Sequence, residues 1–262
     1  MVASAAERWR DALEAWAIPP SILASAEESP WIHPPEMFTV PATPGATPSH
    51  DRAREALVDR GSVLDVGCGG GAAAFALTPP AARVVGVDHQ PEMLRMFEDN
   101  AAARGVAWET IEGFWPAVAD RAPVADVVTS HHVVYNVGDV APFLTALSAH
   151  ARRRVVLEMP DHHPLSSMSD AWGTFWQLER PTGPTPDDLL AVLGEMGVAA
   201  HRERFRSPLR SGVSLERAAH FLRIRLCLAS SREGEVYDYL AAQPAPADRE
   251  LSTVWWDVDA RA

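Results

Sequence analysis

Residues 130–136, SHHVVYN, gather the side chains of this chain that are best suited to move a proton. His131 and His132 follow a short apolar run, and Tyr135 and Asn136 come shortly after them. An imidazole has an ordinary pKa near neutrality, so it can accept the proton that an oxygen or nitrogen nucleophile loses. We therefore expect His131 or His132 to act as a general base, with Tyr135 in the catalytic group and Asn136 in contact with a substrate. The alternative is that one histidine points into a helix layer and the other makes structural hydrogen bonds.

A second polar cluster, EMPDHHP, occupies residues 158–164. Glu158, Asp161, His162 and His163 follow another apolar run, so we expect them at an equivalent end of a sheet, with Glu158 in contact with the substrate. Histidines beside carboxylates raise the question of a metal ion. Adjacent residues of an extended segment point opposite ways, so each histidine pair offers one ligand at most. Substrate contact and loop hydrogen bonding are therefore favoured, and no metal site is expected.

Residues 63–77, VLDVGCGGGAAAFAL, run from an apolar strand through a glycine-rich bend into an alanine-rich helix. Cys68 is the only residue from 67 to 71 that is not glycine. A tight turn alone needs one or two glycines, whereas four let the backbone bend sharply and approach a ligand closely. Asp65 lies two residues before the first glycine. Its carboxylate is expected to face a positively charged part of a ligand.

Asp88 ends the next apolar run, VVGVDH at residues 84–89. Beside a glycine loop, a carboxylate in this place can accept hydrogen bonds from both hydroxyls of a ribose. The alternative role for Asp88 is to cap the helix that starts at Pro91, and the two roles are compatible. The sequence therefore predicts a nucleoside site between the glycine bend and the end of the second strand.

The glycine spacing leaves a second kind of nucleoside open. Gly67-x-Gly69-x-x-Ala72 formally fits the dinucleotide fingerprint, which is typical of nicotinamide and flavin enzymes. Asp65 disfavours this assignment, because a carboxylate at that place would repel a pyrophosphate.

Together, VLDVGCGGG and VVGVDHQPEML resemble the first two motifs of the class I S-adenosylmethionine-dependent methyltransferases. The resemblance covers residues 49–178 well, and it implies a Rossmann-like methyltransferase fold that binds S-adenosyl-L-methionine. In that family the glycine loop surrounds the methionine part of the cofactor, and the acid on the second strand binds the ribose. Cofactor contacts are accordingly assigned to the matching residues and to several neighbours, namely Asp65, Gly67, Cys68, Gly69, Gly71, Asp88, His89 and His131.

One stretch departs from the family pattern. The family usually has an acid near the end of the third strand that pairs with the adenine amine, whereas residues 111–116 are IEGFWP, with Phe114 in its place. Phe114 and Trp115 are expected to flank the adenine by stacking, while backbone groups make its polar contacts. The alternative is that both are ordinary core aromatics.

The elements that position these residues follow from hydrophobic periodicity. Short β-branched runs with two apolar faces predict buried strands at residues 63–66, 83–87, 106–111, 124–129 and 154–157. Further strands are expected at 199–205 and 251–258, and helices at 8–17, 49–59, 91–104, 139–150, 170–178, 185–196, 215–228 and 233–241. Strands that alternate with helices require crossover connections. The predicted fold class is therefore α/β, with a doubly wound, mostly parallel seven-stranded sheet.

The first part of the chain predicts a different organisation. Eight prolines between residues 19 and 48 prevent a long regular element. We therefore expect residues 1–48 to form a helical and proline-rich arm or lid, and residues 49–262 to form the Rossmann-like domain. Trp31 in the arm, together with Trp172 and Trp176, is expected to line an apolar substrate pocket.

Composition limits the partners. The chain has 23 arginines, no lysine and 35 acidic residues, which gives a net charge of −12. Phosphate contacts with basic side chains supply most nucleic-acid affinity, and a net negative charge opposes them, so no nucleic-acid partner is expected. The run of Arg202, Arg204, Arg206 and Arg210 is placed on one solvated face. No apolar run reaches the ~18–20 residues of a bilayer crossing, and the start of the chain lacks a signal-peptide core. We expect a cytoplasmic protein with no membrane partner and unpaired cysteines; the oligomeric state, a homodimer included, stays open.

The main hypothesis is an S-adenosylmethionine-dependent methyltransferase that acts on oxygen or nitrogen of a small molecule. The alternative is a non-catalytic S-adenosylmethionine-binding protein or regulatory partner, which the altered stretch at residues 111–116 motivates. A nicotinamide oxidoreductase is the third candidate.

Overall fold

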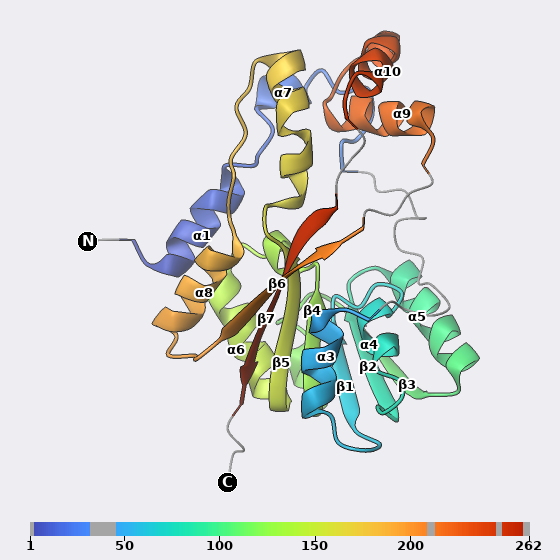
Figure 1. Cartoon of the computed structure of the whole chain (residues 1–262), viewed down its shortest axis with the longest axis vertical. Coiled ribbons are helices and arrows are strands. Elements are labelled where there is room, and N and C mark those ends of the chain that lie inside the picture. The colour runs from blue at the N-terminus through green and yellow to red at the C-terminus, as the bar shows by residue number, and fades with distance from the viewer. Residues whose placement is uncertain (1–2, 32–45, 209–212, 245–247, 259–262) are drawn as a thin grey trace.

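A computed structural model describes residues 3–31, 46–208, 213–244 and 248–258 (Figure 1). Its seven-stranded sheet has the strand order β3-β2-β1-β4-β5-β7-β6. The strands are β1 (Ser62–Val66), β2 (Arg83–Asp88), β3 (Ala107–Glu112), β4 (Ala125–His131), β5 (Ala151–Pro160), β6 (His201–Ser207) and β7 (Arg249–Asp257). β1 to β5 are parallel, and β7 runs antiparallel to both β5 and β6. The predicted fold class is confirmed.

The helices agree closely with the predicted segments. They are α1 (Ala5–Glu14), α2 (Pro20–Leu23), α3 (Pro48–Ala56), α4 (Ala72–Ala76), α5 (Pro91–Arg104), α6 (Val140–His150), α7 (Ser169–Trp176), α8 (Pro186–Glu195), α9 (Leu215–Arg225) and α10 (Glu233–Ala241). α3 begins one residue before the predicted Ser49, because Pro48 takes the first position and the Thr47 side chain accepts a hydrogen bond from the N–H of His50. Within the described residues, no helix is long and apolar enough to cross a bilayer.

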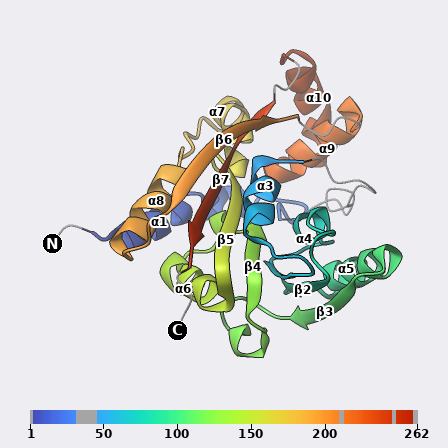
Figure 2. The ribbon, with the colours of Figure 1, turned by 60° about the horizontal axis from the view of Figure 1, so that its bottom comes forward.

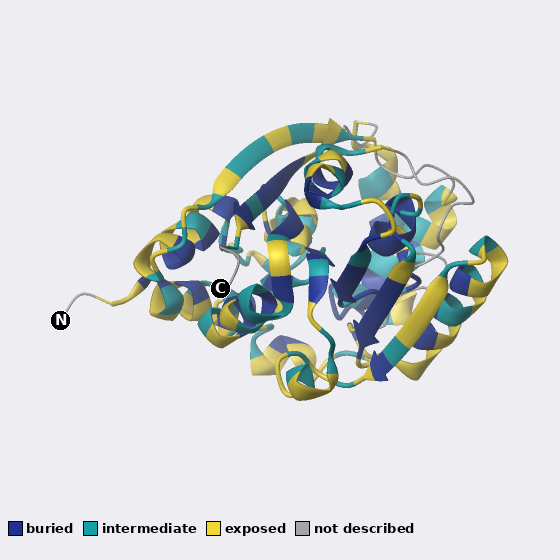
Figure 3. Cartoon of the chain, turned by 90° about the horizontal axis from the view of Figure 1, so that it is seen from below, coloured by how far each residue is buried: buried dark blue, intermediate teal, exposed yellow. Residues whose placement is uncertain are grey.

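Successive side chains of a strand point to opposite faces of the sheet. Both faces carry apolar side chains, and helices cover both of them (Figure 2). Val63 of β1 packs in the core that α3, α4 and α5 share, whereas Leu64 packs in the core of α1, α6 and α8. Figure 3 shows buried residues concentrated along the middle of the sheet. The glycine bend after β1 and the segments after β4 and β5 follow the carboxyl ends of parallel strands, which lie at the same end of the sheet. The fold therefore brings the predicted site residues of these segments to that end.

Two expectations about exposure are wrong. β3 was expected to be buried on both faces, but it is the last strand at one side of the sheet, and Ile111 is the only one of its residues that is buried. Arg202 was expected on a solvated face, but its guanidinium is largely buried and lies 2.9 Å from the buried carboxylate of Asp161. Arg204 also reaches Asp161, at 3.1 Å, so two ion pairs connect β6 to the residue that follows β5. Arg210, which was expected on the same face, lies outside the described residues.

A third hydrophobic core lies outside the two sheet layers. It joins α7, α9 and α10 to the segment that precedes residue 32, with Ile22, Trp172, Leu226 and Val236 at its centre. We call α2, α7, α9 and α10 the cap (Figure 1). The predicted arm is thus divided: α1 packs on the main domain, where Trp9 is fully buried, while the residues around Ile22 belong to the cap. The rest of the arm up to residue 45 lies outside the described residues.

Candidate functional site

The glycine bend after β1 is held by its own packing. Gly67, Gly69 and Gly71 have φ values of 72°, 51° and 89°, in the left-handed region that favours glycine. A Cβ on Gly67 would lie 2.3 Å from Cγ2 of Val133, and one on Gly71 would lie 2.1 Å from Cε2 of Phe75. At these two positions the absence of a side chain is required by the protein itself.

Gly69 is different, because a Cβ there would meet no described atom within 4 Å. Its N–H donates to Oδ2 of Asp88 at 3.0 Å, and the side-chain amide of Asn100 donates to the carbonyl of Gly70 at 3.1 Å. The bend therefore presents open backbone at its tip, while its flanks are tied to β2 and α5. Cys68 is buried inside the bend, and burial raises the pKa of its thiol.

Asp88 ends β2 where the sequence placed it, directly beside the bend. Asp88 is 8% exposed, and its Oδ1 accepts a hydrogen bond from the N–H of Gln90 at 3.0 Å. Each carboxylate oxygen has a second acceptor position, so both oxygens can still bind ligand hydroxyls. The capping contact with the start of α5 and a ribose contact remain compatible, as the sequence suggested.

Asp65 is fully buried, and its two oxygens bind protein groups. Oδ1 accepts from the Thr129 hydroxyl at 2.9 Å, and Oδ2 accepts from the N–H of Ala74 at 3.3 Å. Burial raises the pKa of Asp65 to about 7, against the effect of these two hydrogen bonds. The residue joins β1, β4 and the start of α4 beneath the bend; its contact with a cofactor stays a prediction.

The two aromatic residues after β3 have different surroundings. Phe114 is 68% exposed and stacks on the ring of His89, with a centroid distance of 4.5 Å. Trp115 packs against the main core, where its ring meets His150 edge-on and its Nε1–H donates to the carbonyl of Phe143 at 3.4 Å. Trp115 thus has the core role that the sequence left open, whereas Phe114 and His89 form an exposed aromatic platform beside Asp88.

His131 ends β4 on the face of the sheet that α3 covers. Its ring stacks on His50 of α3 at 5.7 Å, and its Nε2 is buried without a hydrogen-bond partner among the described residues. Burial lowers the pKa of His131 to about 3. The ring is therefore uncharged at neutral pH, and it is a weak proton acceptor.

His132 and Glu158 form a contact that the sequence did not predict. Nε2 of His132 lies 3.0 Å from Oε1 of Glu158, and the backbone N–H of His132 donates to the Glu158 carbonyl at 2.7 Å. The Thr47 hydroxyl donates to Oε2 of Glu158 at 3.2 Å. Glu158 was expected to contact the substrate; the structure shows it bound to His132, which directly follows β4, and to Thr47, the N-cap residue of α3.

Thr47, Ser49 and His50 are members of this site that the sequence did not predict. Ser49 and His50 are buried, and Ser49 bonds Thr253 of β7 at 2.6 Å. These residues precede the glycine motif, in a segment where only the start of a helix was expected. No local signal places them over β4 and β5; the sheet topology does.

Tyr135 lies one turn beyond the histidines, in contact with a second group of rings. It meets His163 edge-on at 5.8 Å, and His163 stacks on Trp16 at 4.4 Å. Burial raises the pKa of Tyr135 to about 12, so its hydroxyl stays protonated at neutral pH. Asn136 is exposed at the end of the same short turn.

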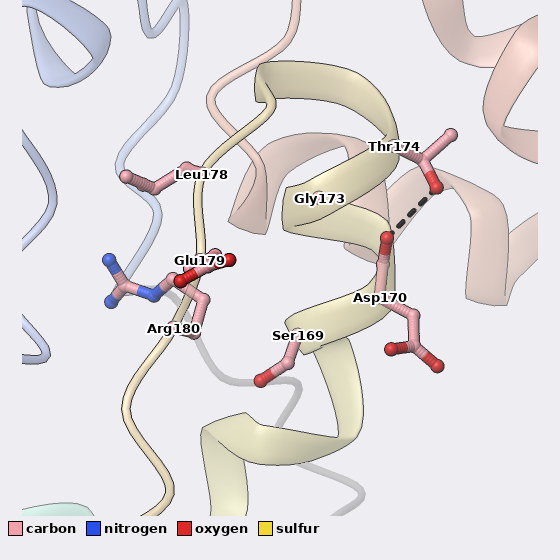
Figure 4. A pocket seen from close by; sticks show the side chains of 7 residues that line it. All are labelled: Ser169, Asp170, Gly173, Thr174, Leu178, Glu179 and Arg180. Atoms are coloured by element: carbon pink, nitrogen blue, oxygen red, sulfur yellow. Dashed lines mark hydrogen bonds between the residues drawn. The ribbon is translucent and has the colours of Figure 1, made fainter.

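The tryptophans expected around a substrate pocket lie in the cap. Trp172 is buried in the cap core, Trp176 donates to the Leu226 carbonyl at 2.6 Å, and Trp31 is exposed near Trp172. A cavity of about 620 Å³ lies between α7 and the irregular segment that follows it (Figure 4). Its lining residues are Ser169, Asp170, Gly173, Thr174, Leu178, Glu179 and Arg180, and none of the predicted site residues is among them. In the described ranges, no group of three or more His, Cys, Asp or Glu side chains is arranged to hold a metal ion.

A family model and curated relatives each match a part of the chain. Residues 63–154 match a family model described as "Methyltransferase domain". The ribosomal protein L11 methyltransferase of Vibrio cholerae is 36% identical over 87 residues, which are 33% of this chain and 29% of that protein. The chain thus spans less than a third of the length of the curated relatives that it matches.

Two solved structures share the fold at low sequence identity. The YcgJ protein from Bacillus subtilis superimposes with a TM-score of 0.55 at 15% identity, over 82% of this chain and 99% of that one. A protein of echinomycin biosynthesis, described with the conversion of a disulfide bond into a thioacetal group, has a TM-score of 0.55 at 17% identity and covers 92% of both chains. The shared fold extends well beyond the matched motif region.

Proposed function

We propose, from the premise that residues 63–154 form a methyltransferase domain, that the protein transfers the methyl group of S-adenosyl-L-methionine to oxygen or nitrogen of a small molecule. One observation carries the proposal: the bend at Gly69 presents open backbone beside the two carboxylate oxygens of Asp88. That arrangement suits a nucleoside whose ribose hydroxyls need acceptors and whose remaining part lies close to the main chain.

The residues present fit this cofactor. Asp88 would accept the ribose hydroxyls, the exposed His89–Phe114 platform would support the adenine, and the glycine bend would follow the methionine part. When bound, S-adenosyl-L-methionine supplies an electrophilic methyl group on a sulfonium. In-line attack on such a carbon depends mainly on alignment, so the task of the protein is to hold both partners in place and to remove a proton from the acceptor.

The proposed acceptor is small because of where the cap lies. α7 begins nine residues after the carboxyl end of β5, and the cap lies beyond the end of the sheet that carries the site (Figure 1). A site beneath helices admits a small molecule more readily than a folded macromolecule. The net charge of −12 also disfavours a nucleic acid. The curated relatives named for ribosomal protein L11 share only a third of this chain, so their substrate is not carried over.

Calorimetric titration with S-adenosylmethionine and S-adenosylhomocysteine tests the proposal. We expect both to bind the wild-type protein, and we expect Asp88→Asn to weaken binding of S-adenosylhomocysteine at least tenfold, because hydrogen bonds to a charged acceptor contribute about 1.5–3 kcal/mol. Asp120→Asn, an exposed residue away from the bend, is the control and should leave the affinity unchanged.

Each outcome has a definite meaning. Absence of binding by either compound at high micromolar concentration removes the proposal. Equal affinities in wild type and Asp88→Asn would show that the ribose lies elsewhere. Tight binding without formation of S-adenosylhomocysteine from a broad panel of phenols, alcohols and amines would favour the non-catalytic binding protein.

A further inference from the structure

Glu158 of β5 holds His132, the residue that directly follows β4, at two points. The 2.7 Å backbone hydrogen bond fixes the main chain of His132, and the 3.0 Å contact between Nε2 and Oε1 fixes its ring. The backbone of His132 has a φ of 61°, in the left-handed region that non-glycine residues seldom occupy. Such a conformation is strained and persists where the surroundings impose it.

Glu158 is a charged anchor for this ring. Glu158 is 6% exposed, and its Oε2 accepts a hydrogen bond from the Thr47 hydroxyl. Burial raises the pKa of Glu158, but the hydrogen bonds that it accepts, from His132 above all, outweigh burial and hold the pKa below its usual range. An ionised carboxylate only accepts hydrogen bonds, so the proton of a neutral His132 must sit on Nε2. The lone pair then lies on Nδ1.

We propose that Glu158 is a positioning residue that fixes His132 in the tautomer with a basic Nδ1, and that this nitrogen takes the proton of the methyl acceptor. The reaction rests on the proposed function, whereas the tautomer does not. In the step, Nδ1 of His132 receives the proton of the acceptor O–H or N–H, and the freed electron pair forms the bond to the methyl carbon. The carbon–sulfur bond breaks with its pair going to sulfur, and the imidazolium later returns the proton to solvent.

The other candidates fit this role less well. The side chain of His132 is 31% exposed and so reachable, whereas Nε2 of His131 is buried. The lowered pKa of His131, about 3, makes it a poor acceptor, and the raised pKa of Tyr135, about 12, keeps its proton in place. Glu158 would also stabilise the imidazolium that forms on His132, as the buried carboxylate does in a catalytic triad.

Nitrogen-15 NMR of the imidazoles tests the positioning directly. In wild type, we expect the His132 signals, assigned by their loss in His132→Gln, to show the Nε2–H tautomer. In Glu158→Gln the amide oxygen should keep the Thr47 donor, which turns the NH₂ group toward Nε2 of His132. The proton must then move to Nδ1, and the tautomer should invert. His162→Gln, an exposed histidine near the same strand end, is the control and should leave the His132 signals unchanged.

Kinetics provide the second readout. With any acceptor that gives turnover, Glu158→Gln should lower kcat by a hundredfold or more while KM and the dissociation constant of S-adenosylhomocysteine change less than about threefold. An Nδ1–H tautomer in wild type, or the same tautomer in wild type and Glu158→Gln, would overturn the positioning role. An unchanged kcat in Glu158→Gln would overturn the role of His132 as base. Failure of wild type to bind S-adenosylhomocysteine would instead contradict the proposed function, and the tautomer result would stand apart from it.

Discussion

Asp65 and His131 lie on the same face of neighbouring strands, and burial favours the uncharged form of each. Burial raises the pKa of the acid Asp65 to about 7 and lowers the pKa of the base His131 to about 3. The sequence identified both residues as candidates from their positions next to apolar runs. It did not predict their charge states, because desolvation depends on α3 and α4, which only the folded chain brings over them.

The raised pKa of Asp65 makes stability fall as pH rises. The unfolded residue ionises near pH 4 and the folded one near pH 7, so the folded state binds more protons over that range. Between pH 4 and pH 8, we expect the free energy of unfolding of wild type to fall by up to about 4 kcal/mol relative to that of Asp65→Asn. Urea denaturation at a series of pH values measures this difference. Asp120→Asn, at an exposed residue, is the control and should follow wild type. The same pH dependence of the free energy of unfolding in wild type and Asp65→Asn would contradict the raised pKa of Asp65.

The glycine bend shows how one short segment serves both folding and binding. Its strand-to-helix place and its relation to Asp88 were correctly predicted, because glycine spacing after an apolar run is a local signal. The different surroundings of the individual glycines were not predicted, since they depend on Val133, which is distant along the chain, and on the direction that the Phe75 side chain takes in α4. The exposure of β3 was not predicted either, because it follows from the strand order, which places β3 at the side of the sheet.

Alanine substitutions separate the two uses of the bend. We expect Gly67→Ala to destabilise the fold by about 3 kcal/mol, because the new Cβ meets Val133 and the φ of 72° is strained. Gly69→Ala should cost only about 1 kcal/mol, because its Cβ enters open space, yet it should weaken binding of S-adenosylhomocysteine. Thermal unfolding and calorimetry measure the two effects. A Gly69→Ala protein with wild-type affinity would show that no ligand approaches the bend there.

At the scale of the whole molecule, Arg180 links the arm to the cap. Its guanidinium lies over the rings of Trp16 and Trp172, at 5.3 and 5.1 Å, and donates to the carbonyls of Trp16 and Ala17. Trp16 in turn stacks on His163 after β5. Periodicity predicted the helices of the cap, but not that residues near Ile22 would share a core with α9 and α10, because that contact joins distant parts of the chain.

Removal of this link should loosen the arm. We expect Arg180→Ala to lower the free energy of unfolding by about 2–3 kcal/mol, through lost packing and lost hydrogen bonds, and to speed proteolytic cleavage around residues 17–31. Arg206→Ala, which removes one exposed ion pair to Glu250, should cost less than about 1 kcal/mol. Equal stability losses in the two variants, or an unchanged cleavage pattern, would argue against the link.

The position of β7 has a consequence for biosynthesis. Among the described residues, β6 pairs only with β7, and β7 separates it from β5, yet β7 follows both along the chain. While a ribosome is still translating the residues between β6 and β7, the nascent chain therefore carries one strand without a neighbour and a bare flank along β5. Such a flank can recruit foreign strands. Pairing of β7 with β5 and β6 is the step that closes this flank.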